Sequence, residues 1–278
     1  MISVDGGADW KSCHGEHGGH REGAKETKRR ERRRDEEMKR RRPLIGITMR
    51  QELQTERFYL ARFYSEAVEA AGGAPVHIPL IPDHSFIETL VARMDGILLP
   101  GSDSDVDPLL YGREPQARLG SVHPLRDGTD LLLLKSAEER RLPLLAICYG
   151  IQIWNVSRGG TLIQDIASAL PSAIKHEQGA PRERPSHRVS INPESRLARM
   201  AVGESAIVNS HHHQAIEEIG RDLRATAWSS DGLVEALEDV REGRWALGVQ
   251  WHPELGWAGD KLSGAIFSEF VLAASDNE

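Results

Sequence analysis

From Pro43 onward, short apolar runs alternate with longer amphipathic stretches, and this alternation constrains the fold more than any other feature of the sequence. Continuous apolar runs are typical of strands that are buried on both faces. The stretches between them have the periodicity of helices that cover one face of a sheet. The order of strand, helix and strand predicts an α/β fold with a mostly parallel central sheet and helices on both faces.

The predicted elements can be placed along the chain. In the first half, the expected strands are residues 44–49, 76–80, 96–99 and 144–147, and the expected helices are residues 58–71, 85–93 and 127–141. Beyond Pro171 the pattern changes to strands with period-two alternation, which we place at residues 187–191, 206–208, 225–229, 233–237 and 246–249. A closing helix is expected at residues 261–274.

Charge divides the chain into two parts. Residues 1–42 carry 13 Lys/Arg against 9 Asp/Glu, a balance of +4, whereas residues 43–278 carry 22 against 33, a balance of −11. The first part has almost no apolar side chains after Trp10, so we expect residues 1–42 to be a disordered charged tail and residues 43–278 to form one domain. Two alternatives remain for this segment: it is a basic arm that binds RNA or another anionic partner, or translation begins at Met38.

Composition also excludes several classes of protein. No stretch approaches the ~20 consecutive apolar residues of a membrane helix, and the first residues do not resemble a secretory signal, so we expect no membrane partner and a cytoplasmic location. The acidic balance of residues 43–278 argues against nucleic acid as a partner, because phosphate contacts need cations. With only Cys13 and Cys148, a catalytic thiol is a better interpretation than a disulfide framework.

Cys148 stands where a predicted strand turns abruptly into a helix. Ala146 and Gly150, two residues before and two after it, are small enough for the sharp turn that exposes a nucleophile above a sheet. The partial positive charge of the helix N-terminus favours a reactive thiolate. A buried cysteine in an apolar strand is commonly structural, and only this elbow context favours a nucleophile.

A thiol nucleophile needs a base, and His252 follows the strong predicted strand at residues 246–249. The carboxyl ends of parallel strands meet at one edge of a sheet, so His252 and Cys148 are expected side by side. Glu254 lies two residues further on, where its carboxylate can orient the imidazole and stabilise its cation. The sequence therefore predicts a Cys–His–Glu triad.

Several separated motifs together resemble a known family. They are Cys148-Tyr-Gly-Ile-Gln152, Gly159-Gly-Thr-Leu-Ile-Gln-Asp165, Val208-Asn-Ser-His-His-His-Gln-Ala215 and Gly248-Val-Gln-Trp-His-Pro-Glu254. The pattern looks like the flavodoxin-like class I glutamine amidotransferase fold, and within it is most similar to the γ-glutamyl-γ-aminobutyrate hydrolases of the peptidase C26 group. The resemblance covers about residues 43–274.

The resemblance implies roles for individual residues. Cys148 is the nucleophile, His252 the base and Glu254 its orienter, with the amides of Tyr149 and Ser102 as oxyanion donors and Gly101 in reserve. Substrate contacts implied in the same way are Gln152, Asn209, Ser210, His212, His213 and Arg126. The chain departs from the usual family pattern at Ala146, Tyr149 and Ser102, so contacts near the thiol are expected to differ.

The predicted activity is hydrolysis of the γ-glutamyl amide bond of a small conjugate, such as γ-glutamyl-γ-aminobutyrate, through a γ-glutamyl thioester. The alternative is a glutaminase subunit that delivers ammonia to a synthetase partner. We expect no cofactor and no metal, because consecutive histidines in a strand point to opposite faces and no Cys or carboxylate stands at ligand spacing near His211–His213. The released amine and the oligomeric state, including a homo-oligomer, are left open.

Overall fold

The computed structural model describes residues 41–276. The predicted tail at residues 1–42 therefore lies almost entirely outside the described residues, and its disorder stays a prediction. Among the described residues, no helix combines the length and the apolar character needed to cross a membrane.

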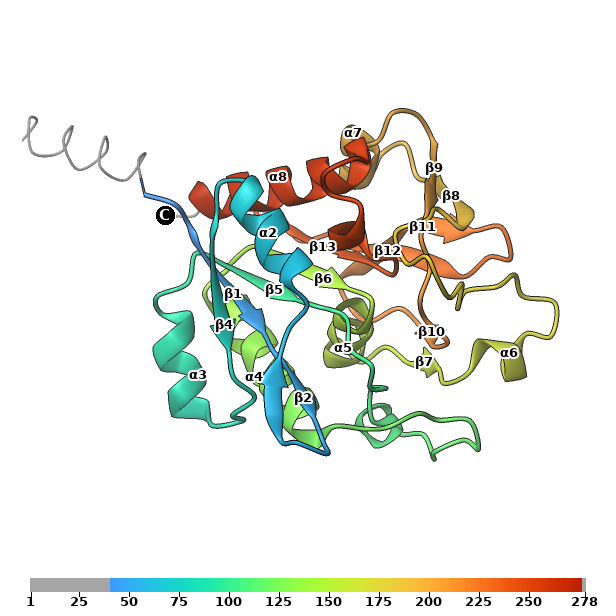
Figure 1. Cartoon of the computed structure of the whole chain (residues 1–278), viewed down its shortest axis with the longest axis horizontal. Helices are drawn as coiled ribbons and strands as arrows, with labels where there is room; N and C mark the ends of the chain where they lie inside the picture. Colours follow the sequence, from blue (N-terminus) through green and yellow to red (C-terminus); the bar gives the residue numbers. More distant parts are fainter. Residues whose placement is uncertain (1–40, 277–278) are drawn as a thin grey trace, which may run out of the picture. The chain divides into compact units, whose positions relative to one another are not determined.

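Five parallel strands form the centre of the sheet (Figure 1). In spatial order they are β4 (Ala74–Ile78), β1 (Leu44–Thr48), β5 (Gly96–Leu99), β6 (Leu144–Ile147) and β13 (Ala246–Val249). In β5, β6 and β13 every residue is buried, which explains why these strands read as continuous apolar runs rather than as alternating ones. The predicted parallel sheet is confirmed, with the strand that bears Cys148 at its carboxyl end beside the strand that leads to His252.

An antiparallel extension continues the sheet from β13. Its strands, in spatial order, are β12 (Val234–Asp239), β11 (Leu223–Ser229), β8 (His187–Ile191) and β9 (Ser205–Val208). Two short strands, β7 (Leu162–Ile163) and β10 (Ala215–Ile216), pair with each other, and β10 also pairs with β12. Alternate residues of β8 are buried and exposed, as period-two patterning predicts for a sheet with one solvated face.

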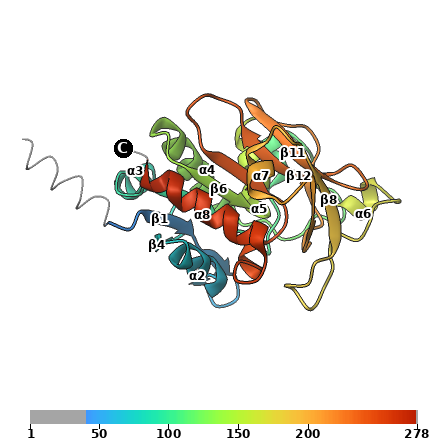
Figure 2. The same cartoon turned by 90° about the horizontal axis from the view of Figure 1, so that it is seen from above.

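Helices cover both faces of the parallel strands (Figures 1 and 2). On one face, α2 (Arg62–Ala70) and α8 (Lys261–Ser275) pack on alternate residues of β1 and β6, such as Ile45 and Ile147. On the other face lie α3 (His84–Val91), α4 (Pro124–Glu139) and α5 (Tyr149–Ser157). The remaining short helices are α6 (Ile166–Ala169), α7 (Arg196–Met200), η1 (Pro108–Tyr111) and η2 (Pro253–Leu255).

The expected helix at residues 58–71 was wrong at its start. A two-stranded ribbon of β2 (Arg50–Glu52) and β3 (Arg57–Tyr59) precedes it, and the helix begins only at Arg62. Phe58 pairs with Gln51 across this ribbon. Strand β3 of this ribbon is exposed, so its aromatic residues do not mark a helix face that needs burial. The ribbon has a function in the site, because Arg50 begins it.

Candidate active site

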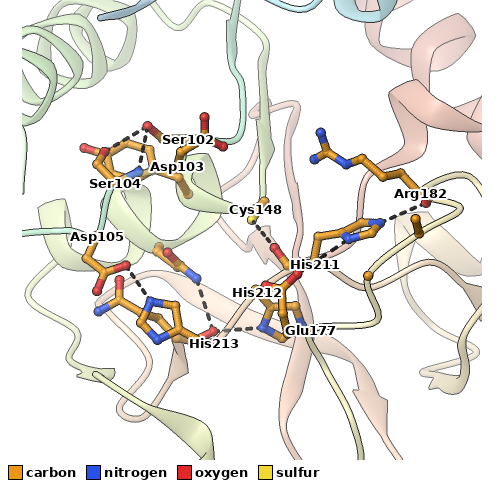
Figure 3. A pocket seen from close by; sticks show the side chains of 15 residues that line it. Ser102, Asp103, Ser104, Asp105, Cys148, Glu177, Arg182, His211, His212 and His213 are labelled. Carbon is orange, nitrogen blue, oxygen red and sulfur yellow. Dashed lines mark hydrogen bonds and ion pairs between the residues drawn. The ribbon is translucent and has the colours of Figure 1, made fainter. Parts of the chain in front are cut away.

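The carboxyl ends of β5 and β6 and the antiparallel extension surround a cavity of about 510 Å³ (Figure 3). Its volume falls in the range of small-molecule sites. The residues that line it are Ser102, Asp103, Ser104, Asp105, Cys148, Tyr149, Gln152, Glu177, Gly179, Ala180, Arg182, His211, His212, His213 and Gln214. The cavity therefore joins the predicted nucleophile to both predicted oxyanion donors and three of the six predicted substrate contacts.

Cys148 occupies a strained turn between β6 and α5. Its backbone has φ 53° and ψ −106°, a left-handed conformation that non-glycine residues rarely adopt and that costs on the order of 1–3 kcal/mol. The thiol lines the cavity although the residue is only 5% exposed. Tyr149 begins α5, and the first N–H groups of a helix have no acceptor within the helix, so its amide is available to a ligand beside the sulfur.

Gly150 allows α5 to start directly against β5. A Cβ atom at Gly150 would lie 2.2 Å from the carbonyl oxygen of Leu99, which is far inside van der Waals contact with rigid backbone. Leu99 is also the residue from which the loop to Gly101 and Ser102 departs. The close approach at Gly150 therefore sets the distance between the predicted nucleophile and the loop that carries the second predicted oxyanion donor.

We expect Gly150→Ala to displace this junction and lower kcat/KM by about 100-fold, the loss that a 1 Å misplacement can cause. The same strain should lower the free energy of unfolding by about 1–3 kcal/mol. Gly259→Ala is the matched control, since a Cβ at Gly259 meets nothing within 4 Å. Kinetics and thermal unfolding measured on both variants check this, and wild-type kinetics in Gly150→Ala would contradict the assigned role of Gly150.

His252 lies directly after β13 and is fixed at both ends. Its Nδ1 is 2.7 Å from Oε1 of Glu254, while its backbone N–H and C=O are each held at 2.8 Å by the side-chain amide of Asn209. Nε2 makes no hydrogen bond with any other described group. Burial lowers the pKa of His252, but the charges of Glu254 and Cys148 outweigh burial and raise the pKa to about 10. The imidazole is thus set to be a cation beside the sulfur.

A buried network connects the loop after β5 to Glu254. The hydroxyl of Tyr64 accepts a hydrogen bond of 3.1 Å from the amide of Gly101, and burial and the nearby charge of Glu254 raise the pKa of this tyrosine. Arg50 donates from Nε to the carbonyl oxygen of Gly101 at 2.7 Å and from Nη1 to Asp103 at 3.0 Å. A Cβ on Gly101 would lie 2.7 Å from Cε1 of His252, so only glycine fits there.

These contacts bear on the two candidate donors in the loop. The Gly101 amide is already used on Tyr64, whereas the amide of Ser102 has no acceptor among residues 41–276. Ser102 lines the cavity, and its Oγ is 2.8 Å from Oγ of Ser104. The geometry therefore favours the amide of Ser102 over that of Gly101 as the second oxyanion donor, beside the amide of Tyr149.

Arg126 lies away from the cavity, contrary to its expected contact with substrate. Its guanidinium is 1% exposed and donates to Asp130 at 2.5 Å and to the carbonyl oxygens of Met49 and Pro100 at 2.7 and 2.9 Å. These carbonyls belong to the segments that follow β1 and β5. Arg126 thus supports the backbone beneath the site, because a cation at the start of α4 reaches inward rather than toward solvent.

The other predicted substrate contacts divide into two groups. Gln152, His212 and His213 line the cavity, and Nε2 of His213 donates to the Asp105 carboxylate at 2.7 Å, an interaction that raises the pKa of His213. Asn209 and Ser210 lie behind the wall. Asn209 holds His252, and the amide of Ser210 donates to Gln178 at 2.7 Å.

Sequence reasoning missed several residues of this site. Asp105, Glu177, Arg182 and Gln214 line the cavity, and Tyr64 and Arg50 hold Gly101 in the loop after β5. Arg50 had a usable signal, since it follows a strand whose carboxyl end faces the site. Tyr64 had none, because a tyrosine in an amphipathic helix reads as an ordinary core residue.

Fold and site together define a class I glutamine amidotransferase-like hydrolase. The chain belongs to the peptidase C26 family, whose model matches residues 43–254.

Proteins similar to the chain include a putative glutamine amidotransferase-like protein, YvdE, of Lactococcus lactis, which is 38% identical over 77% of this chain and 88% of its own length. The γ-glutamyl-γ-aminobutyrate hydrolase PuuD of Escherichia coli is 37% identical over 83% of this chain and 93% of its own length. A solved structure, that of a putative GMP synthase subunit from Thermoplasma acidophilum, matches with a TM-score of 0.58 at 16% identity, covering 85% of this chain and 96% of that one. This last match supports the fold.

Proposed function

We propose that the protein hydrolyses the γ-glutamyl amide bond of a small conjugate such as γ-glutamyl-γ-aminobutyrate. Cys148 is the nucleophile, His252 the base and acid, and Glu254 the group that orients His252. The observation that carries the proposal is that a cysteine on a strained elbow, which lines the cavity, interacts with a buried His–Glu pair. The similarity to PuuD supports the choice of conjugate.

The residues support a two-step reaction. The Cys148 thiol passes its proton to Nε2 of His252 and its sulfur attacks the γ-carbonyl carbon, while the developing oxyanion accepts hydrogen bonds from the amides of Tyr149 and Ser102. The C–N bond then breaks as His252 gives its Nε2 proton to the leaving amine, which leaves a γ-glutamyl thioester on Cys148. Water attacks the thioester while His252 takes its proton, and the thiolate departs with glutamate released.

The cavity wall has charges that suit the glutamyl end of such a substrate. Asp103, Asp105 and Glu177 can face its α-ammonium group, and Arg182 and His213 can face its α-carboxylate. Asp105 and His213 are already paired with each other, so one of them must exchange its partner when substrate binds.

Steady-state kinetics on three compounds test the proposal. We expect kcat/KM to be higher for γ-glutamyl-γ-aminobutyrate than for glutamine, since the larger amine adds binding energy that can be used in the transition state. The α-linked isomer should react poorly, because its scissile carbonyl is displaced from the oxyanion donors. Mass spectrometry of a quenched reaction should show a glutamyl adduct on Cys148.

A glutaminase that serves a synthetase is the second candidate, favoured by the amidotransferase-like name of the Lactococcus lactis relative. The same assay separates the two functions. Efficient turnover of glutamine only after a second protein is added would replace hydrolysis of conjugates with ammonia delivery. Equal rates for the α-linked and γ-linked isomers would contradict any γ-glutamyl pocket.

A further inference from the structure

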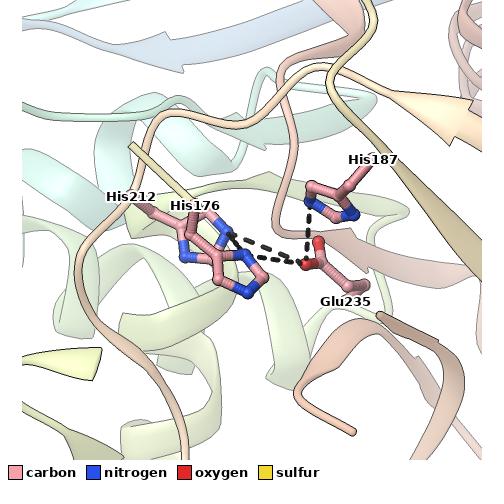
Figure 4. A group of neighbouring side chains, drawn as sticks. All are labelled: His176, His187, His212 and Glu235. Atoms are coloured by element: carbon pink, nitrogen blue, oxygen red, sulfur yellow. Dashed lines mark hydrogen bonds and ion pairs between the residues drawn. The ribbon is translucent and has the colours of Figure 1, made fainter. Parts of the chain in front are cut away.

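Three histidines and one glutamate meet at the cavity wall, where His212 is the member that also lines the cavity (Figure 4). His176 lies in the loop after α6, His187 begins β8, His212 precedes β10 and Glu235 lies in β12. All four residues are buried, and Glu235 is 0% exposed. The proposed reaction uses none of them as acid, base or nucleophile, so the cluster needs its own explanation.

The shorter distances within the cluster are close to those between the ligands of a tetrahedral metal ion, and the longest would have to contract on binding. Oε1 of Glu235 is 3.4 Å from Nδ1 of His176, 3.4 Å from Nε2 of His187 and 3.8 Å from Nε2 of His212. Nδ1 of His176 is 3.2 Å from Nε2 of His212, and all four atoms lie within 4.8 Å of one another. Metal–nitrogen bonds of ~2.0–2.1 Å in a tetrahedron separate the ligands by roughly 3.3 Å.

The second nitrogen of each histidine faces an acceptor outside the cluster. Nε2 of His176 is 3.0 Å from the Asp231 carboxylate, Nδ1 of His212 is 2.9 Å from the carbonyl oxygen of Gln214, and Nδ1 of His187 is 3.3 Å from that of Arg188. Each acceptor favours the tautomer whose free lone pair points into the cluster. Metal-binding histidines are oriented by outer carboxylates and carbonyls in the same way.

Both carboxylate oxygens of Glu235 and Nε2 of His187 are buried without a hydrogen-bond partner among the described residues. A buried carboxylate that accepts nothing is costly, because it has lost its hydration without compensation. A proton shared by His176 and its neighbours would compensate part of this cost. A divalent cation would satisfy all four inward atoms at once.

We propose that His176, His187, His212 and Glu235 bind one divalent transition-metal ion, for which Zn²⁺ is the best fit. Three imidazole nitrogens and one carboxylate oxygen at tetrahedral spacing suit Zn²⁺. The protein fills all four positions, so the ion is structural and holds no open site for water or substrate. It ties together four separate segments and thereby fixes the wall from which His211 and His213 face the cavity.

Metal content tests the proposal directly. Tag-free full-length protein, expressed with Zn²⁺ in the medium and desalted, should contain about one equivalent of zinc by mass spectrometry. Glu235→Gln and His187→Gln should lose most of it. His84→Ala, which changes an exposed histidine of α3, and a His14/His17/His20→Ala variant, which removes histidines of the N-terminal segment, should keep it.

A second measurement does not depend on any variant that fails to fold. Removing the ion from wild-type protein with a strong chelator should lower Tm by about 5–10 °C, and stoichiometric Zn²⁺ should restore it. Co²⁺ added to the stripped protein should give the visible absorption of a four-coordinate ion. Less than a tenth of an equivalent of any divalent metal, together with a Tm that neither chelator nor added Zn²⁺ changes, would overturn the proposal and leave a proton shared among the four residues in place of the ion.

Discussion

Replacing Cys148 by alanine is expected to lower kcat/KM on a γ-glutamyl amide by at least about 10⁴-fold, because no other group at the elbow can form the thioester. Cys148→Ser should be nearly as severe, since a hydroxyl is far harder to ionise with the same base. The folded structure should persist in both variants, because the thiol faces the cavity and its removal leaves the apolar core of β6 in place. Kinetics combined with the thermal unfolding curve check this.

Alkylation provides the control for this prediction. Iodoacetamide should inactivate the enzyme by labelling Cys148. Cys13, which lies outside the described residues, is the comparison cysteine. A Cys13→Ser variant should therefore keep full activity and full sensitivity to the reagent. Full activity in Cys148→Ala would contradict the whole mechanism, not only the substrate assignment.

The parallel half of the sheet was predictable because burial on both faces leaves a continuous apolar run. β5 and β6 begin and end at the predicted residues, and β13 does so as well. The juxtaposition of Cys148 and His252 followed from the same property, since parallel strands end at one edge. Neither inference needed knowledge of side-chain contacts.

Features that depend on contacts between distant segments could not be predicted in this way. Arg126 was expected to contact substrate, yet its side chain holds two backbone carbonyls beneath the loop. Only the end of the ribbon that contains Arg50 fell within the predicted helix at residues 58–71, because Phe58 and Tyr59 continue the amphipathic pattern of the helix that follows.

The cluster around Glu235 escaped prediction for the same reason. The prediction of no metal rested on the sequence neighbours of His212, whereas β8 and β12 bring His187 and Glu235 to it from other parts of the chain. Local spacing cannot reveal such a site, since the antiparallel pairing that assembles it is set by long-range register.

The charges of His252 and Glu254 depend on each other. The pKa of His252 is raised to about 10 from an ordinary value of 6.5, so the stability from its cation is present below pH 6.5 and is lost as pH rises through about 10. The pKa of Glu254 is lowered by His252 despite burial, so the stability from its anion is present above pH 4.5 and is lost as pH falls through the folded-state value. Both groups are therefore ionised across neutral pH.

His252→Ala is expected to lower kcat/KM by about 10⁴-fold, the upper end of what acid–base catalysis contributes, because the thiolate loses its counter-ion and the leaving amine its proton donor.

Glu254→Gln should lower kcat/KM by about 10²-fold, since the amide oxygen can still accept from Nδ1 while the stabilising charge is lost. Without that charge the pKa of His252 must fall, so the alkaline limb of the kcat/KM profile should move toward neutral pH. Glu139→Gln, a change to an exposed carboxylate of α4 outside the site, should leave that limb in place and controls for a general effect of charge. An alkaline limb that is the same in wild type and Glu254→Gln would mean that Glu254 does not set the protonation of the base.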